Sequence, residues 1–118
     1  MKRSRVLLML FLISAATFEV MAADWKALKG TYAITPKNYL DPSDDEPKDS
    51  HLRFQLSGET AKELYLAMKV AEKPDQCTGA TAKRVGEMRC LFYKSEKKYA
   101  CHFAIDVMQQ KIEYGVAC

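Results

Sequence analysis

Apolar and polar positions alternate most clearly in the last thirty residues of the chain. The stretch "MRCLFYKSEKKYACHFAID", residues 88–106, continues to Cys118 with the same period of two if residues 94–97 and 108–111 form turns. Side chains of a strand point alternately to the two faces of a sheet. One face then collects Cys90, Phe92, Tyr99, Cys101, Phe103, Ile105, Val107, Ile112, Tyr114, Val116 and Cys118. The pattern predicts a three-stranded antiparallel meander with one apolar face.

The opposite face of this meander is mixed in character. It collects Arg89, Leu91, Tyr93, Ala100, His102, Ala104, Asp106, Glu113, Gly115 and Ala117. Two further strands are predicted upstream. "GTYAIT", residues 30–35, reads as a short strand, and "HLRFQL", residues 51–56, alternates three apolar with three polar side chains. We therefore expect one or two N-terminal strands beside the meander.

Helical spacing follows the second of these strands. Ala61, Leu64, Tyr65, Met68 and Ala71 recur on one side of a helix. Ser57 is suited to cap the start of this helix. Glu59 in the first turn interacts favourably with the helix dipole. Pro74 is expected to end the helix, and residues 73–87 to form a polar connection. With the helix packed on the apolar face of the sheet, the predicted fold class is α+β.

The N-terminus carries the pattern of a secretory signal peptide. Lys2, Arg3 and Arg5 precede an apolar run of about 13 residues, which is shorter than the ~20 residues needed to span a bilayer. Cleavage is expected after Ala22, or one residue later after Ala23. Residues 1–22 are thus interpreted as a cleaved signal, and residues 23–118 as one small domain in the periplasm or the medium.

The charge that remains after cleavage argues against two classes of partner. The formal net charge of +3 falls to +1, because residues 1–22 contain three basic residues and one acid. A nearly neutral domain has no general attraction for nucleic acid or for anionic membranes. We expect no nucleic-acid partner and no stable membrane insertion once the signal is removed.

The four cysteines, Cys77, Cys90, Cys101 and Cys118, all lie in the expected mature domain. An even number in a short exported chain indicates two disulfides rather than a metal site. The predicted turns place Cys101 opposite both Cys90 and Cys118. We prefer Cys101–Cys118 together with Cys77–Cys90. Cys101 and His102 are adjacent on a strand, so they point to opposite faces and do not form a catalytic pair.

Few residues suggest catalysis or cofactor binding. The chain lacks a phosphate-binding glycine loop, G-x-S-x-G and H-E-x-x-H. His51 and His102 could converge as metal ligands, but both are expected to be solvated on polar strand faces. Basic residues such as Arg84 and Arg89 are likewise read as solvated charges. No catalytic residue, metal or cofactor is predicted.

Two features are candidate interaction elements. The first is "DPSDDEPKDS", residues 41–50, a loop whose acids are Asp41, Asp44, Asp45, Glu46 and Asp49. It either solubilises the chain or attracts a basic partner. The second is the mixed outer face of the meander around Leu91 and Tyr93. That face is either covered by the N-terminal segment through Trp25, Leu28, Tyr32 or Leu40, or it is a docking surface.

In size, export and disulfide content the chain resembles small periplasmic inhibitors, such as those against lysozyme, and immunity proteins against cell-wall toxins. The resemblance assigns no role to any residue. It implies a non-catalytic binding protein that acts on an envelope or cell-wall enzyme, which would be a basic protein. The alternatives are a small envelope hydrolase and a structural accessory protein of the envelope. The sequence leaves the partner and the oligomeric state open.

Overall fold

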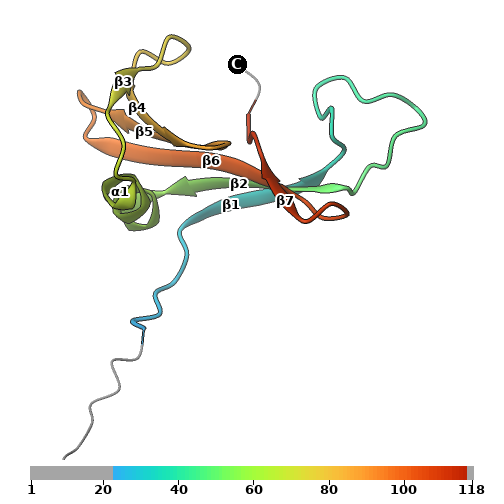
Figure 1. Ribbon diagram of the computed structural model, residues 1–118, viewed down its shortest axis with the longest axis horizontal. Helices are drawn as coiled ribbons and strands as arrows, with labels where there is room; N and C mark the ends of the chain where they lie inside the picture. Colours follow the sequence, from blue (N-terminus) through green and yellow to red (C-terminus); the bar gives the residue numbers. More distant parts are fainter. Residues whose placement is uncertain (1–22, 117–118) are drawn as a thin grey trace, which may run out of the picture.

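The computed structural model describes residues 23–116, and it has an α+β fold (Figure 1). The predicted signal peptide, residues 1–22, and Cys118 lie outside the described residues. Within the described range there are one helix and one seven-stranded antiparallel sheet. The elements are β1 (Gly30–Thr35), β2 (His51–Ser57), α1 (Gly58–Ala67), β3 (Lys73–Pro74), β4 (Thr81–Val85), β5 (Met88–Tyr93), β6 (Lys98–Asp106) and β7 (Lys111–Glu113).

Strand β6 organises the sheet, whose order is β1-β2-β6-β5-β4-β3, with β7 also paired to β6. Strand β2 pairs with residues 100–106 of β6. Strand β5 pairs with residues 98–102 and β7 with residues 104–106, so both must occupy the edge that β2 leaves free. The predicted meander had β5 and β7 on opposite edges of β6. That arrangement is wrong, because the N-terminal strand β2 takes one of the two edges.

The two C-terminal turns were predicted with different success. The turn at residues 94–97 is confirmed, since Tyr93 pairs with Lys98. The next turn occupies residues 107–110 rather than 108–111, since Asp106 pairs with Lys111. In both turns the last residue, Lys97 or Gln110, has a positive φ of 52° or 53°. A left-handed residue at the end of a hairpin loop is a common way to re-enter the next strand.

The helix is shorter than predicted. Ser57 does occupy the N-cap position, but its side chain makes no capping hydrogen bond. The helix ends at Ala67, and Pro74 lies in β3 instead of terminating the helix. The polar connection predicted for residues 73–87 therefore contains β3 and β4, two strands that sequence reasoning missed.

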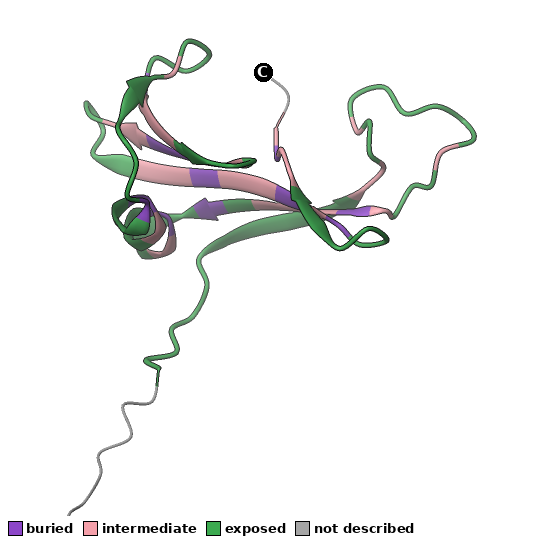
Figure 2. Cartoon of the chain, viewed as in Figure 1, coloured by how far each residue is buried: buried purple, intermediate pink, exposed green. Residues whose placement is uncertain are grey.

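The core lies between α1 and the middle of the sheet, and Figure 2 shows buried segments there on α1, β2 and β6. It contains Leu56, Ala61, Tyr65, Met68, Cys90 and Cys101. The Tyr65 ring packs edge-on against Tyr99, with ring centroids 5.3 Å apart. Its hydroxyl donates a 2.8 Å hydrogen bond to Glu72. Burial raises the pKa of Tyr65, and the hydrogen bond to Glu72 raises it further.

A disulfide joins Cys90 to Cys101 across β5 and β6. The preferred pairing of Cys77–Cys90 with Cys101–Cys118 is therefore wrong. The predicted pairing fails because β5 and β7 share one edge of β6. Strand β5 occupies that edge at Cys101 and excludes the C-terminal strand there. No cysteine is free among the described residues.

The outer face of the sheet is covered by the C-terminal segment, not by the N-terminal one. Trp25 and Leu40 are 92% and 72% exposed, so the predicted N-terminal cover is wrong. Residues 114–116 instead cross β6, where a Cβ added to Gly115 would lie 2.4 Å from the backbone nitrogen of Phe103. Arg53 fixes this crossing by donating hydrogen bonds to the carbonyl oxygens of Tyr114 and Gly115.

Candidate functional site

The apolar face of the sheet is only partly covered by α1. Two cross-strand rows of apolar residues extend beyond the helix. One row is Tyr32, Phe54 and Phe103, and the other is Ile34, Leu52, Ile105 and Ile112. Residues directly opposite in a sheet share a face. We call these two rows the uncovered face.

Accessibility increases from the core toward the edges of the uncovered face, whose central side chains Phe54 and Phe103 pack against the core. Tyr32, Ile34 and Ile112 are 71%, 62% and 47% exposed, whereas Leu56 in the next row is 5% exposed under the helix. Phe54 and Phe103 are half-buried, and their rings stack on each other at 4.8 Å between centroids. The exposed apolar side chains are thus held in place by the sheet and not scattered over loops.

The direction of α1 explains why it covers so little. In Figure 1 the helix is seen almost end-on, while β2 and β6 run across the view. A helix crossing strands covers about 10 Å of their length, whereas the nine residues of β6 extend about 30 Å. One helix in this orientation cannot cover the whole apolar face.

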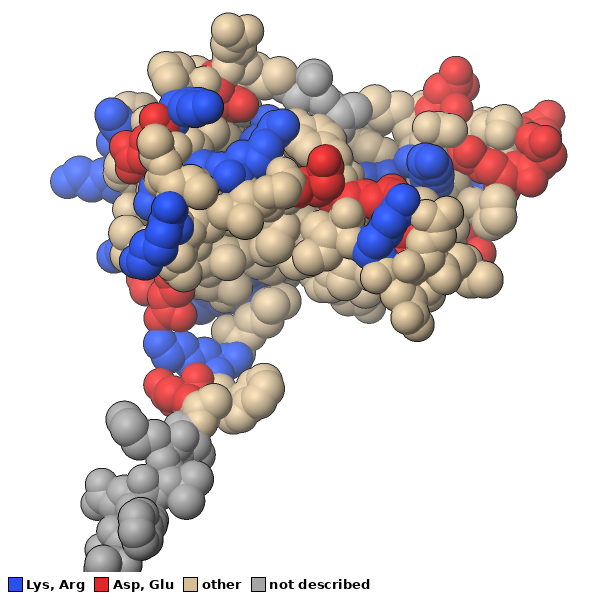
Figure 3. Space-filling model, viewed as in Figure 1, with Lys and Arg blue, Asp and Glu red and all other residues tan. Residues whose placement is uncertain are grey.

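The acidic loop lies at one end of the uncovered face, because residues 36–50 connect β1 to β2 just beyond Ile34 and Leu52. Asp41, Asp44, Asp45 and Asp49 are exposed, and Figure 3 shows acidic side chains gathered on this loop. Glu46 is half-buried, and its carboxylate accepts hydrogen bonds from the backbone and side-chain amides of Asn38.

The base of the acidic loop is fastened to the sheet by Arg53. Its guanidinium donates hydrogen bonds to the Thr35 hydroxyl and the Lys37 carbonyl, both at 2.8 Å. It also lies over the Tyr39 ring, 4.2 Å from the centroid. These contacts position the exposed acids of the loop relative to the uncovered face.

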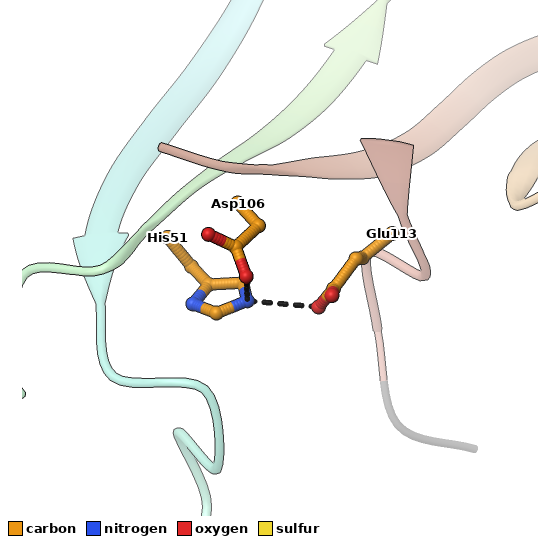
Figure 4. A group of neighbouring side chains, drawn as sticks. All are labelled: His51, Asp106 and Glu113. Atoms are coloured by element: carbon orange, nitrogen blue, oxygen red, sulfur yellow. Dashed lines mark hydrogen bonds and ion pairs between the residues drawn. The ribbon is translucent and has the colours of Figure 1, made fainter. Parts of the chain in front are cut away.

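A second candidate is a buried group formed by His51, Asp106 and Glu113, from β2, β6 and β7 (Figure 4). The His51 Nε2 atom lies 2.8 Å from Glu113 Oε2 and 3.8 Å from Asp106 Oδ2. Its other nitrogen, Nδ1, is 2.7 Å from the Ser50 hydroxyl. The His51 side chain is 2% exposed, so the expectation of a solvated histidine is wrong.

The outer face also holds buried charge. Arg89 is 3% exposed, and its guanidinium makes an ion pair with Asp75 at 3.1 Å and lies over the Tyr114 ring. The expected solvated Arg89 is therefore wrong. His102 is half-buried beside it, and its Nδ1 has no hydrogen-bond partner. Burial lowers the pKa of His102, and the nearby Arg89 charge lowers it further.

The outer-face docking candidates are not equivalent. Leu91 is 1% exposed, so it cannot contact a partner in this conformation. Tyr93 is half-buried at the end of β5, opposite Lys98. The apolar surface that is open to solvent is the uncovered face, on the opposite side of the sheet. Sequence reasoning placed Phe103, Ile105 and Ile112 on that side but expected the helix to cover them. It was wrong for Tyr32, which was offered as cover for the outer face, and for Tyr114, which was placed on the apolar face but lies over Arg89 on the outer face.

The His51 cluster was missed for a related reason. His51 and Asp106 are direct neighbours in the register of β2 and β6, and Glu113 faces the next outward-pointing position, Ala104. Strand alternation had already placed Asp106 and Glu113 on one face, and His51 on the polar face of its own strand. The pairing of β2 with β6 was needed to bring them together.

Within residues 23–116, the helix is too short and too polar to cross a membrane. No protein-family model, curated protein or solved structure matches this chain.

Proposed function

We propose that the protein is an exported, non-catalytic binding protein that inhibits, or confers immunity to, a basic envelope or cell-wall enzyme. The observation that carries the proposal is the uncovered face, an ordered apolar surface bordered by the acidic loop. Contiguous apolar patches on soluble domains are typical of interaction sites. The predicted signal peptide supports export, and the Cys90–Cys101 disulfide is compatible with an oxidising compartment.

The chemistry of this surface favours a basic protein partner. Residues 41–50 contain five acids and one basic residue, Lys48. Lys48 donates a hydrogen bond to the Ser43 carbonyl within the loop. Complementary charge accelerates association, and apolar contacts supply the affinity once water is excluded. A basic enzyme that acts on anionic wall polymers therefore suits this surface.

The test uses the exported protein as bait for envelope proteins. A captured enzyme should lose wall-degrading activity when the protein is added. Ile34→Asp should abolish capture, because it places a charge in the apolar contact. Asp44→Asn combined with Asp45→Asn should slow association several-fold at low salt, with the difference fading near 0.5 M salt. Glu46 is left intact because it fixes Asn38.

A matched control removes two acids elsewhere. Glu87 and Glu96 are exposed in the hairpins that begin and end β5, away from the acidic loop. Glu87→Gln combined with Glu96→Gln should leave the association rate unchanged. If both pairs of substitutions slowed association equally, the slowing would come from the change in net charge and not from the acidic loop. Unchanged capture by Ile34→Asp would remove the uncovered face from the interface.

One observation favours a hydrolase as the alternative. Ser50, His51 and Glu113 are connected by contacts of 2.7 and 2.8 Å, which is the order of groups in an activated serine nucleophile. A reactive Ser50 should label with a fluorophosphonate, and Ser50→Ala should prevent labelling. We favour the binding protein because the imidazole that would act as base is almost completely buried.

A further inference from the structure

We propose that His51, Asp106 and Glu113 form a binding site for one divalent transition-metal ion, with Zn²⁺ as the best match. The site is independent of the proposed interaction surface. His51 Nε2, Asp106 Oδ2 and Glu113 Oε2 come from three neighbouring strands and face one another (Figure 4). One ligand atom from each residue lies within 4.8 Å of the other two.

The distances suit a metal that draws the three side chains together. Ligand atoms of a tetrahedral zinc ion lie about 2.0–2.2 Å from the metal, and hence roughly 3.3 Å from each other. The distances from His51 Nε2 to the two carboxylates are 2.8 and 3.8 Å, which bracket this value. The contact to Asp106 is too long for a hydrogen bond. The third separation, between the two carboxylates, is at most 4.8 Å, so the two carboxylates would have to approach each other by up to about 1.5 Å to reach ligand distance.

Two of the three ligands, His51 and Asp106, are each oriented by a second group. His51 Nδ1 contacts the Ser50 hydroxyl at 2.7 Å. If Nδ1 carries the hydrogen and donates it to Ser50, the lone pair on Nε2 is free for a metal. Asp106 Oδ1 accepts hydrogen bonds from the backbone amides of Met108 and Gln109 at 3.0 and 2.9 Å, which leaves Oδ2 for the ion. Such outer contacts are the usual support of metal ligands.

The charge at the cluster also favours a cation. Two carboxylates face one imidazole that is 2% exposed, and Asp106 is 9% exposed in its side chain. Lys111 lies 3.7 Å from Glu113 Oε1, but its side chain is 57% exposed and on the solvent side. A protonated His51 would neutralise one carboxylate. A divalent ion neutralises both.

Donor chemistry selects the ion. An imidazole nitrogen suits zinc and its neighbours among the transition metals better than calcium or magnesium, which prefer all-oxygen sites. Glu113 is 22% exposed, so a fourth position on the metal can be reached by water or by a side chain of another molecule. The ion would cross-link β2, β6 and β7 at the end of the sheet opposite the helix.

The test begins with the exported protein after treatment with a chelator. Titration with Zn²⁺, followed by calorimetry and by mass spectrometry under non-denaturing conditions, should show one ion per chain. Zn²⁺ should also raise the thermal unfolding midpoint by several degrees, since a ligand that binds only the folded state stabilises it. Absence of binding by the correctly folded protein overturns the proposal.

Substitutions of the three ligands and of Ser50 test whether these residues form the Zn²⁺ site. His51→Gln and Glu113→Gln should each weaken Zn²⁺ binding at least about tenfold, and Ser50→Ala should weaken it by about 10–100-fold through the lost support of His51. Asp106→Asn keeps the Oδ1 acceptor for the turn, and it should also weaken binding. Circular dichroism before metal addition identifies any variant that fails to fold.

His102→Gln is the matched control, because His102 is the only other histidine. It should bind Zn²⁺ within about twofold of the unaltered protein, since the residue contributes no ligand at this site. Binding that His102→Gln abolishes, or that survives in both His51→Gln and Glu113→Gln, contradicts the assignment.

Discussion

Gly115 is the residue on which the cover of the outer face depends. A Cβ at this position would meet the Phe103 nitrogen at 2.4 Å and the His102 carbonyl carbon at 2.8 Å, and both are backbone atoms that cannot swing aside. We expect Gly115→Ala to cost about 1–3 kcal/mol in the free energy of unfolding, as overpacking does. Denaturant unfolding measures it.

The control for this prediction is Gly79→Asn. Gly79 has a φ of +72° and nothing within 4 Å of an added Cβ. Asparagine tolerates that backbone conformation better than most residues, so the cost should be about 1 kcal/mol or less. An equal cost at both positions would mean that the close passage at Gly115 is not what matters.

His102 gives the fold a dependence on pH with a definite sign. Its pKa is lowered in the folded state by burial and by Arg89, whereas an unfolded histidine titrates near about 6.5. The unfolded chain therefore takes up the proton first as pH falls. The contribution of His102 is present above about pH 6.5 and is lost below it, until the lower pKa of the folded state is reached.

We expect His102→Gln to make the decrease in unfolding free energy between about pH 7 and pH 5 shallower. Urea titrations at several pH values, with the unaltered protein alongside, provide the measurement. Identical slopes for the two proteins would show that His102 is not shifted by its surroundings.

At the scale of elements, α1 stabilises the sheet by packing on a core that includes Leu56 of β2. This side chain is 5% exposed beneath the helix, whereas Leu66 on the far side of α1 is 52% exposed. Leu56→Ala should cost about 2–5 kcal/mol, as large-to-small core changes do, and Leu66→Ala about 0.5 kcal/mol or less. Equal costs in a denaturant titration would contradict this orientation of the helix.

The local pattern of apolar and polar residues predicted several strands correctly, but it predicted poorly which strands pair with each other. Strand alternation identified β1, β2 and the β5–β6 hairpin, because each is a local property of consecutive side chains. It assigns residues to faces but not strands to edges, so it could not tell that β2 and not β7 would lie beside Cys101. The disulfide and the His51 cluster both follow from that long-range pairing.

The sequence also could not predict how much of the apolar sheet face the helix covers. The apolar periodicity of α1 indicates which of its sides is buried, but not the angle at which it crosses the strands. Because the helix runs across the strands and not along them (Figure 1), the Tyr32 and Ile34 rows are left open. Strands β3 and β4 were missed because a polar stretch with two glycines reads as a loop.

At the scale of the whole molecule, we expect a second disulfide between Cys77 and Cys118. Because Cys90 pairs with Cys101, only Cys77 and Cys118 are left to form the second disulfide expected in an oxidising compartment. Thiol labelling of the denatured, unreduced protein should find no free thiol. Tryptic peptide mapping without reduction should recover Cys90 linked to Cys101 and Cys77 linked to Cys118. A peptide joining Cys77 to Cys90 would contradict the Cys90–Cys101 disulfide between β5 and β6.

We propose that the uncovered face binds a partner. Photo-crosslinking in cells tests it most directly, with a light-activated amino acid in place of Ile34, or of Val85 as control. These positions are 62% and 47% exposed, on β1 and β4 respectively. Position 34 should give a discrete adduct with a basic envelope protein, and position 85 little or none. No adduct at position 34, or equal adducts at both positions, would contradict the account.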